Sequence, residues 1–125
     1  MKDVDLPFPE NKSISLIGQK DDFVFVKSKG KLSKLNIKDI YYIEALKDYV
    51  IINTSDARYT VHSTMKEIEA KMKNSELVRV HRSFIVQLDK VIAIDYPNLI
   101  LENNKKLIPI GRSYRDELNK RIRLV

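Results

Sequence analysis

From Asp22 onward the chain consists of short apolar runs, rich in Val, Ile, Phe and Tyr, that alternate with polar positions and are separated by turn residues. Alternation with a period of two is typical of strands with one buried face, and strand spacing near 8–12 residues is typical of all-β folds. The pattern predicts strands over 23–27, 31–35, 40–44, 49–53, 57–61, 77–80, 84–88, 91–95, 99–101 and 106–110. Turns are expected at 28–30, 54–56, 96–98 and 103–104.

Two stretches instead have helical spacing. Thr64 and Glu67 fit a capping box, in which each side chain accepts a hydrogen bond from the other residue's backbone N–H. An apolar stripe follows, consisting of Met65, Ile68 and Met72. Ser113 is predicted to cap a second helix, whose apolar face comprises Tyr114, Leu118 and Ile122. The expected fold is therefore mainly β with two short helices, and the methionines are expected in the core.

A chain of 125 residues is about one domain long. Residues 1–20 contain Pro7 and Pro9 and little periodicity, so we expect a poorly ordered leader or linker, or an edge strand near 14–17. Residues 21–125 are expected to form the single domain. Its predicted core comprises Phe23, Phe25, Ile43, Ile51, Ile68, Val80, Phe84, Val86 and Leu118.

The segment 78–88 contains a conflict between pattern and charge. Its even-numbered apolar positions, which are 78, 80, 84, 86 and 88, would share one face of a continuous strand. Arg82 would then be buried on the same face, which costs several kcal/mol unless the charge is paired. We therefore predict that the strand breaks at 81–83 and that Arg82 reaches the surface. There it could bind phosphate or guanine, or form a salt bridge with a surface carboxylate.

Net charge adds a partner class. Lys and Arg total 23 against 17 Asp and Glu, for a net charge of +6. Almost all of the excess positive charge lies after Asn103, where the sequence has seven basic residues and only two acidic ones, Asp116 and Glu117. A basic surface attracts polyanions through counterion release, so nucleic acid is the leading partner class. Charge alone is equally compatible with a soluble basic protein that binds no nucleic acid.

The sequence lacks the residue sets that the common classes of enzyme use for catalysis. The sequence has no Cys and only His62 and His81, so a common zinc set is absent. A Ser-His-Asp set drawn from Ser83, His81 and Asp89 would lie in one short segment without a nucleophile turn. The three glycines form no phosphate loop. We expect a protein that is not an enzyme and that binds no metal or cofactor.

Location follows from what the sequence lacks. No apolar run approaches the ~20 residues of a membrane span, and the first residues lack a secretory signal. A cytoplasmic protein with no membrane partner is expected.

Two further segments place cations beside turns. In 109–115 a strand passes through Gly111 into the predicted helix, with Arg112 just before its cap, where backbone N–H groups favour anions. Arg115 follows in the first turn, where a positive charge opposes the helix dipole and suggests an outside partner or a neighbouring carboxylate. In the loop 44–49, Lys47 and Tyr49 could contact a phosphate or a base edge.

Four segments together resemble the LytTR-type DNA-binding domain of bacterial response regulators. The matching motifs are Tyr42-Ile43-Glu44-Ala45 with Lys47-Asp48-Tyr49-Val50, Ser63-Thr64-Met65-Lys66-Glu67-Ile68-Glu69, Arg79-Val80-His81-Arg82-Ser83-Phe84-Ile85-Val86, and Ile108-Pro109-Ile110-Gly111-Arg112-Ser113-Tyr114. Their order and spacing agree across 22–124. The resemblance implies elongated β-sheets rather than a helix-turn-helix, with loops that enter successive major grooves and bend the DNA.

The resemblance also implies the contact surface. It consists of Lys47, Asp48, Tyr49, His81, Arg82 and Arg112, with Ser113 and Arg115 as phosphate contacts. Arg82 and Arg112 would make bidentate contacts with guanine, worth about 1–3 kcal/mol of discrimination each. Lys47 and Arg115 would mainly position the phosphate backbone.

Partners follow from the same resemblance. We expect double-stranded DNA with repeated half-sites, a monomer when free, and self-association on DNA. Family members are usually fused to a receiver domain, and no receiver is expected within these 125 residues. The chain is therefore either the output half of a longer two-component regulator, with a receiver domain or sensor kinase as partner, or a stand-alone regulator. The alternative function is a basic β-rich module that binds protein or structured RNA.

Overall fold

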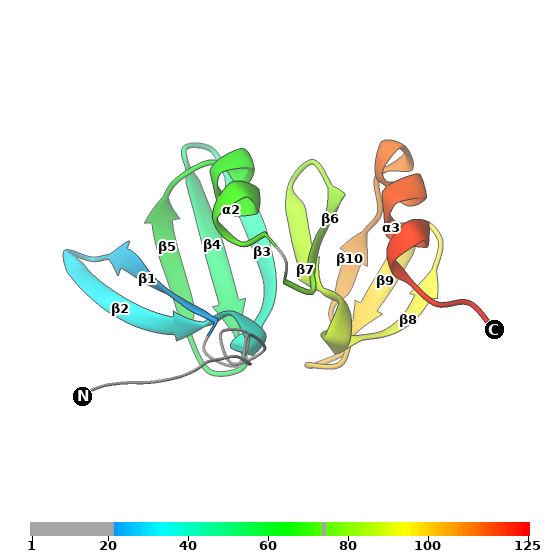
Figure 1. The fold of residues 1–125 in the computed structure, drawn as a ribbon, viewed down its shortest axis with the longest axis horizontal. Helices are drawn as coiled ribbons and strands as arrows, with labels where there is room; N and C mark the ends of the chain where they lie inside the picture. Colours follow the sequence, from blue (N-terminus) through cyan, green and yellow to red (C-terminus); the bar gives the residue numbers. More distant parts are fainter. Residues whose placement is uncertain (1–21, 74) are drawn as a thin grey trace, which may run out of the picture.

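Antiparallel hairpins build most of the computed structural model, which describes residues 22–73 and 75–125 (Figure 1). The strands are β1 (Phe23–Ser28), β2 (Lys31–Asn36), β3 (Ile40–Leu46), β4 (Tyr49–Thr54), β5 (Arg58–His62), β6 (Leu77–His81), β7 (Phe84–Gln87), β8 (Val91–Asp95), β9 (Asn98–Leu101) and β10 (Leu107–Pro109). They form a β1-β2 hairpin, a five-stranded sheet of order β5-β4-β3-β7-β6, and a three-stranded sheet of order β10-β9-β8. Each predicted strand is present, and no strand end differs from its predicted position by more than two residues.

The helices are short and lie against the sheets. They are α2 (Met65–Lys71) and α3 (Arg115–Arg121), and three 3-10 turns accompany them: η1 (Ile37–Asp39), η2 (Leu88–Lys90) and η3 (Arg112–Tyr114). The mainly β fold with two short helices is thus confirmed, and no helix-turn-helix is present in the described residues. Neither helix has the length and apolar character needed to cross a membrane.

The β6–β7 hairpin separates two hydrophobic cores. On one face, Val78, Val80 and Val86 pack into a core shared with β9, β10 and α3. On the other face, Ile85 packs into a core formed with β3, β4, α2 and the β1–β2 hairpin. Although the strand is interrupted between His81 and Phe84, positions 78, 80, 84, 86 and 88 all lie in or against the same core.

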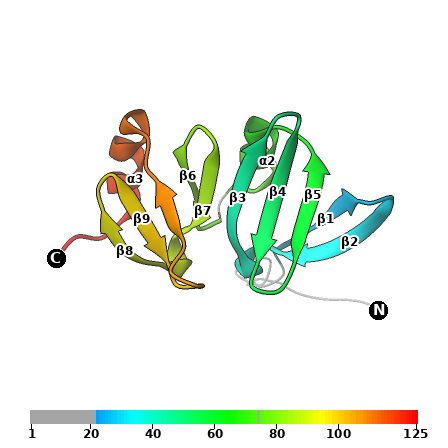
Figure 2. The ribbon, with the colours of Figure 1, turned by 180° about the vertical axis from the view of Figure 1, so that it is seen from behind.

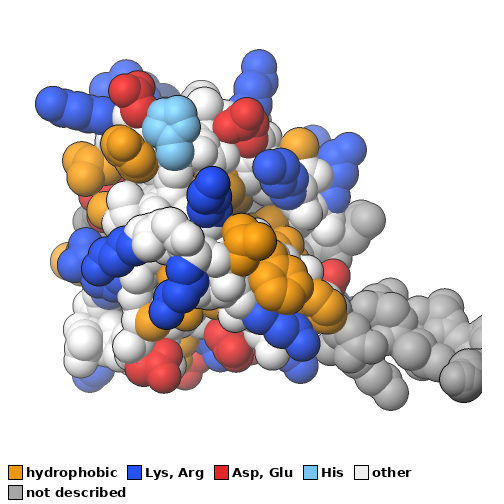
Figure 3. All heavy atoms as spheres, turned by 90° about the vertical axis from the view of Figure 1, so that its left-hand side faces the viewer, with side chains coloured by type: hydrophobic (Ala, Val, Ile, Leu, Met, Phe, Trp, Pro, Cys, Tyr) orange, Lys and Arg blue, Asp and Glu red, His pale blue; other side chains and the backbone are white. Residues whose placement is uncertain are grey.

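The prediction that Phe23 and Phe25 are buried is wrong. Phe23 is 40% and Phe25 is 59% exposed, while Val26 of the same strand is buried. Both faces of this strand are apolar, so alternation could not decide which face packs inward. Their rings lie on the outer face of the hairpin, where Phe25 pairs with Lys34, and Figure 3 shows apolar side chains gathered among Lys and Arg at this end. The other predicted core residues are buried, except Phe84, which is half-buried.

The start of the last helix also differs from the prediction. Ser113 is exposed within η3 and caps nothing; α3 begins at Arg115 with Tyr114 at its N-cap and no side-chain cap bond. A backbone bond from Tyr114 N–H to the Gly111 carbonyl, 2.9 Å, closes this tight turn. The Arg115 N–H, which a Ser113 cap could have engaged, donates instead to the Arg112 carbonyl.

The capping box of α2 is confirmed. The Thr64 hydroxyl accepts from the Glu67 N–H at 3.1 Å, and the Glu67 carboxylate accepts from the Thr64 N–H at 3.0 Å. The hydrogen bond from the Thr64 backbone, followed by one from the Ser63 hydroxyl, lowers the pKa of Glu67 from its ordinary value of 4.5. A lowered carboxyl pKa means that the ionised side chain is favoured by folding.

Shortening single side chains of the β1–β2 hairpin to alanine tests which face of the hairpin is buried. Phe25→Ala is expected to change the free energy of unfolding by no more than about 0.5 kcal/mol, because its ring is largely in water. Leu35→Ala, on the buried face of β2, should destabilise by about 2–5 kcal/mol. Urea unfolding of both variants measures this, and a larger loss for Phe25→Ala would show that the faces are reversed.

The capping box predicts a pH dependence. Because the pKa of Glu67 is lowered, its contribution to stability is present above the ordinary value and is lost as pH falls through the lowered pKa. Glu67→Ala should therefore be less stable than the wild type at about pH 7, and this difference should shrink toward about pH 3. Urea titrations at both pH values, with Lys66→Ala as a control in the same turn, would detect a constant difference that contradicts the prediction.

Candidate nucleic-acid interface

Two hairpin turns emerge at the same edge of the five-stranded sheet. β3 ends at this edge and β7 begins there, since the strands are antiparallel and Glu44 pairs with Phe84. A backbone bond from Ala45 N–H to the Ser83 carbonyl, 2.9 Å, joins the ends of the two hairpins. Because neighbouring strands lie about 4.8 Å apart, the β3–β4 and β6–β7 turns are about 10 Å apart.

The η3 turn continues this row. The Gly111 N–H donates to the Val80 carbonyl at 2.8 Å, which places η3 directly beside the end of β6. A Cβ on Gly111 would lie 3.0 Å from the Tyr114 ring and 3.7 Å from the His81 Cα, so glycine permits this close approach. The β3–β4 turn, the β6–β7 turn and η3 thus share one edge, the upper edge in Figures 1 and 2.

The β3–β4 turn presents Lys47, Asp48 and Tyr49, all exposed. Lys47 has a φ of 56°, in the left-handed region that non-glycine residues rarely adopt. The Tyr49 ring makes an edge contact with the His62 ring at 5.2 Å, at the end of the neighbouring β5. This contact gives Tyr49 a defined orientation at the edge of the sheet.

The β6–β7 turn is ordered by its own histidine. His81 Nδ1 accepts a hydrogen bond from the Ser83 N–H at 3.1 Å, and the ring packs edge-on against Phe84 at 5.6 Å. In the neutral ring, Nε2 therefore carries the proton and is a donor. Arg82 lies at the tip of the turn and is exposed, so the predicted break of the strand at this place is confirmed.

At η3, Arg112 and Ser113 are exposed, whereas Arg115 is half-buried. The Arg115 guanidinium lies over the Tyr96 ring with its Cζ 4.4 Å from the centroid, and its buried Nε has no hydrogen-bond partner among the described residues. Tyr96 lies in the β8–β9 turn, which is held near η3 by a bond from Ile110 N–H to the Pro97 carbonyl, 2.8 Å. Arg115 is therefore packed at the far end of the row.

Charge at this edge is available to a ligand. Within residues 22–73 and 75–125, no carboxylate lies within ion-pair distance of Lys47, Arg82 or Arg112. The same residues contain no group of three side chains that could hold a metal ion. Exposed cations on a common edge can bind an extended anion such as a nucleic-acid backbone.

Sequence reasoning missed two residues of this edge. His62 supports Tyr49, and Arg79 contacts the backbone of the β6–β7 turn. Alternation gave a signal for Arg79, because it occupies the face of β6 opposite to the valines. What that face meets, which is α2, depends on tertiary packing.

Comparison with known proteins shows the family of this chain. Residues 30–123 match the family model described as the LytTr DNA-binding domain. The chain belongs to the LytTr DNA-binding domain family. Membership implies DNA binding in transcription regulation, and the family is a non-enzymatic regulatory module. The fold matches a solved LytTr DNA-binding domain from Bacillus cereus with a TM-score of 0.67, covering 80% of this chain and 95% of that one at 23% identity.

Two relatives place the LytTr domain in longer proteins. The sensory transduction protein LytT of Bacillus subtilis is 37% identical over 91 residues, which are 69% of this chain and 37% of that protein. The heme-containing CO-sensing transcriptional regulator RcoM 2 of Paraburkholderia xenovorans is 27% identical over 102 residues, 78% of this chain and 38% of that protein. The chain thus spans less than two fifths of the length of either relative.

Replacement of the turn histidine tests its internal bond. His81→Phe keeps an aromatic ring against Phe84 but removes the acceptor for the Ser83 N–H. Hydrogen exchange of the Ser83 amide should accelerate about five- to tenfold, the effect of one lost hydrogen bond. His62→Phe, at the same edge, serves as control and should leave that exchange unchanged. Equal exchange in His81→Phe and wild type would mean that the bond does not order the turn.

Proposed function

We propose that this LytTr domain binds double-stranded DNA sequence-specifically, with the β3–β4 turn, the β6–β7 turn and η3 entering the major groove. The observation that carries the proposal is that Lys47, Arg82 and Arg112, which are far apart in the chain, are exposed on one edge. The major groove is about 12 Å wide and admits a two-stranded β-ribbon, so the tip of a single hairpin fits within it. A turn with an arginine at its tip can place that side chain against base edges.

The roles follow from the chemistry of each side chain. Arg82 and Arg112 have forked guanidinium groups that can contact guanine O6 and N7 together, and Asp48 can accept from the cytosine amino group. His81 can donate from Nε2, because Nδ1 is occupied within the turn. The remaining proposed contacts position the DNA backbone, through Lys47, Tyr49, Ser113 and Arg115.

The domain acts as the DNA-binding output module of a regulator. Its relatives have names that describe sensing and transcription regulation, and we propose that signals reach this domain through such partner regions. A single module of this size binds a half-site modestly. Repeated half-sites and self-association on DNA would therefore raise its occupancy.

The base-reading role is tested with Arg82→Ala and Arg112→Ala. Both side chains are exposed, so folding should be unchanged while the preference for a selected duplex over random duplex falls by about 1–3 kcal/mol for each variant. The selected duplex comes from a random pool bound by the wild type, and gel-shift titrations measure the preference. Arg58→Ala is the matched control, since Arg58 is an exposed arginine at the opposite end of β5 from His62.

Two outcomes would contradict this role. An unchanged preference in both arginine variants refutes the assignment of these residues. If the domain binds protein ligands or structured RNA as tightly as it binds DNA, and shows no preference among duplexes, the result would instead favour a basic interaction module.

Lys47 is expected to act differently. Lys47→Gly removes the cation while keeping a residue that readily adopts the positive φ of this turn. Binding should weaken similarly for all duplexes, and the slope of log affinity against log salt should fall by about 0.9, as expected for one lost phosphate contact. Titrations at several salt concentrations measure the slope; a loss confined to one duplex would mean that Lys47 reads bases.

A further inference from the structure

One guanidinium, that of Arg79, holds the β6–β7 turn from beneath. Its Nη2 donates to the Arg82 carbonyl at 2.6 Å, and its Nε donates to the His81 carbonyl at 3.4 Å. These two carbonyls belong to the consecutive peptide groups that flank the Cα of Arg82. Arg79 therefore constrains the backbone that carries the proposed base-reading side chain.

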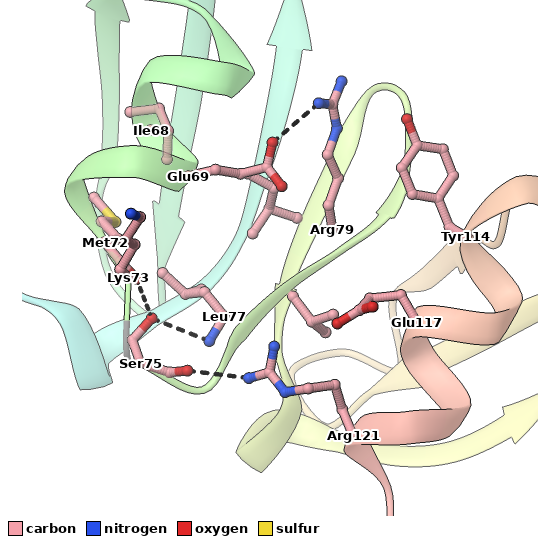
Figure 4. Close-up of a pocket in the computed structure, with 12 residues that line it drawn as sticks. Ile68, Glu69, Met72, Lys73, Ser75, Leu77, Arg79, Tyr114, Glu117 and Arg121 are labelled. Atoms are coloured by element: carbon pink, nitrogen blue, oxygen red, sulfur yellow. Dashed lines mark hydrogen bonds and ion pairs between the residues drawn. The ribbon is translucent and has the colours of Figure 1, made fainter.

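The same guanidinium contacts two further elements. Its Nη1 pairs with the Glu69 carboxylate of α2 at 3.1 Å, and its Cζ lies 5.7 Å from the centroid of the Tyr114 ring in η3. Figure 4 shows Arg79 extending from β6 with Glu69 on one side and Tyr114 on the other. The contact with η3 is reinforced by the backbone bond between Gly111 and Val80. One side chain thus connects α2, the β6–β7 turn and η3.

Magnitudes indicate which contact matters most. The Glu69 side chain is 45% exposed, and an exposed ion pair changes a folding equilibrium by about fivefold at most. The Arg79 side chain is only 22% exposed, and hydrogen bonds from a charged donor change such an equilibrium by about ten- to a hundredfold. The two carbonyl contacts include the shortest of the three bonds, 2.6 Å to the Arg82 carbonyl, and they act on the turn directly, whereas Glu69 mainly orients the guanidinium.

Arg79 differs from the proposed DNA contacts in that its guanidinium is already paired within the domain. Three of its nitrogens are engaged by partners within the domain. Lys47, Arg82 and Arg112 are instead exposed and without ion pairs in the part of the chain that the structure describes. A cation already engaged in this way is poorly placed to release counterions from DNA.

We propose that Arg79 is a positioning residue for DNA recognition: it sets the conformation of the β6–β7 turn and its spacing from η3, and thereby determines sequence preference without touching DNA. This inference rests on the proposed DNA-reading function of the same edge. It assigns specificity to a side chain beneath the interface. The forked shape is essential, because two carbonyls and a carboxylate must be reached together.

The test compares Arg79→Met and Arg79→Lys with the wild type on the selected duplex and on random duplex. Arg79→Met should reduce affinity for the selected duplex by about tenfold or more, the effect of losing charged hydrogen bonds to the turn. Affinity for random duplex, and its salt slope, should stay unchanged. Arg79→Lys keeps the charge but has no fork, so it should lose most of the preference too.

A second readout needs no DNA. Amide NMR spectra of the free domain should show Arg79→Met shifting the signals of His81, Arg82 and Ser83 and of Gly111, while signals from β1 and β2 stay in place. Glu69→Gln is the matched control, because it removes the exposed ion pair and leaves both carbonyl contacts. It should retain most of the preference and most of the turn signals.

The outcomes separate the two proposals. If Arg79→Met weakens binding to all duplexes by the same factor and lowers the salt slope by about 0.9, Arg79 is a phosphate contact and the positioning role is overturned. The role is also overturned if Arg79→Met, folded by circular dichroism, keeps the preference, or if Arg79→Lys keeps it in full. If the wild type itself shows no preference for any duplex, the proposed function fails, and the positioning role with it.

Discussion

The β6–β7 hairpin must be buried on both faces, and the rest of the structure depends on this constraint. Val78, Val80 and Val86 fill one core while Ile85 fills the other, so this hairpin joins the two halves of the molecule. Gln87, also buried, satisfies its amide by donating to the carbonyls of Ile37 and Ile40 at 2.8 and 3.2 Å. A strand pair packed on both sides has little freedom to slide, because a shift of one residue would turn valines and isoleucine toward the wrong core.

This packing confines charged chemistry to the ends of the strands. A cation inside the hairpin would be desolvated, whereas one at the turn remains in water at a fixed position. Arg82 lies at such an end, and Arg79, the charged residue within β6, is accommodated because carbonyls and a carboxylate surround it. The turn is thereby anchored by the two cores and by the Arg79 guanidinium, all of which lie beneath it. Such anchoring suits the recognition role that we propose for this turn.

Much of the fold could be predicted because its signals are local. Alternation located the strands, the Thr64 and Glu67 pair located α2, and the burial penalty of Arg82 located the break between β6 and β7. The failures were at places where local signals are degenerate. Phe23 and Phe25 alternate with valines, so either face of β1 could have packed inward, and Ser113 is a good cap residue in a turn that closes through its own backbone.

The sequence by itself determined the elements, the family, and the candidate cations Lys47, Arg82 and Arg112, because hydrophobic period, capping and the cost of burying charge act over a few residues. Only the tertiary structure decided that these cations share an edge, since their proximity comes from the pairing of β3 with β7 and from the Gly111 contact with β6. The contacts of Arg79 were likewise decided by packing: its partners lie on α2, on the turn and on η3, and no local rule specifies which elements a side chain will meet.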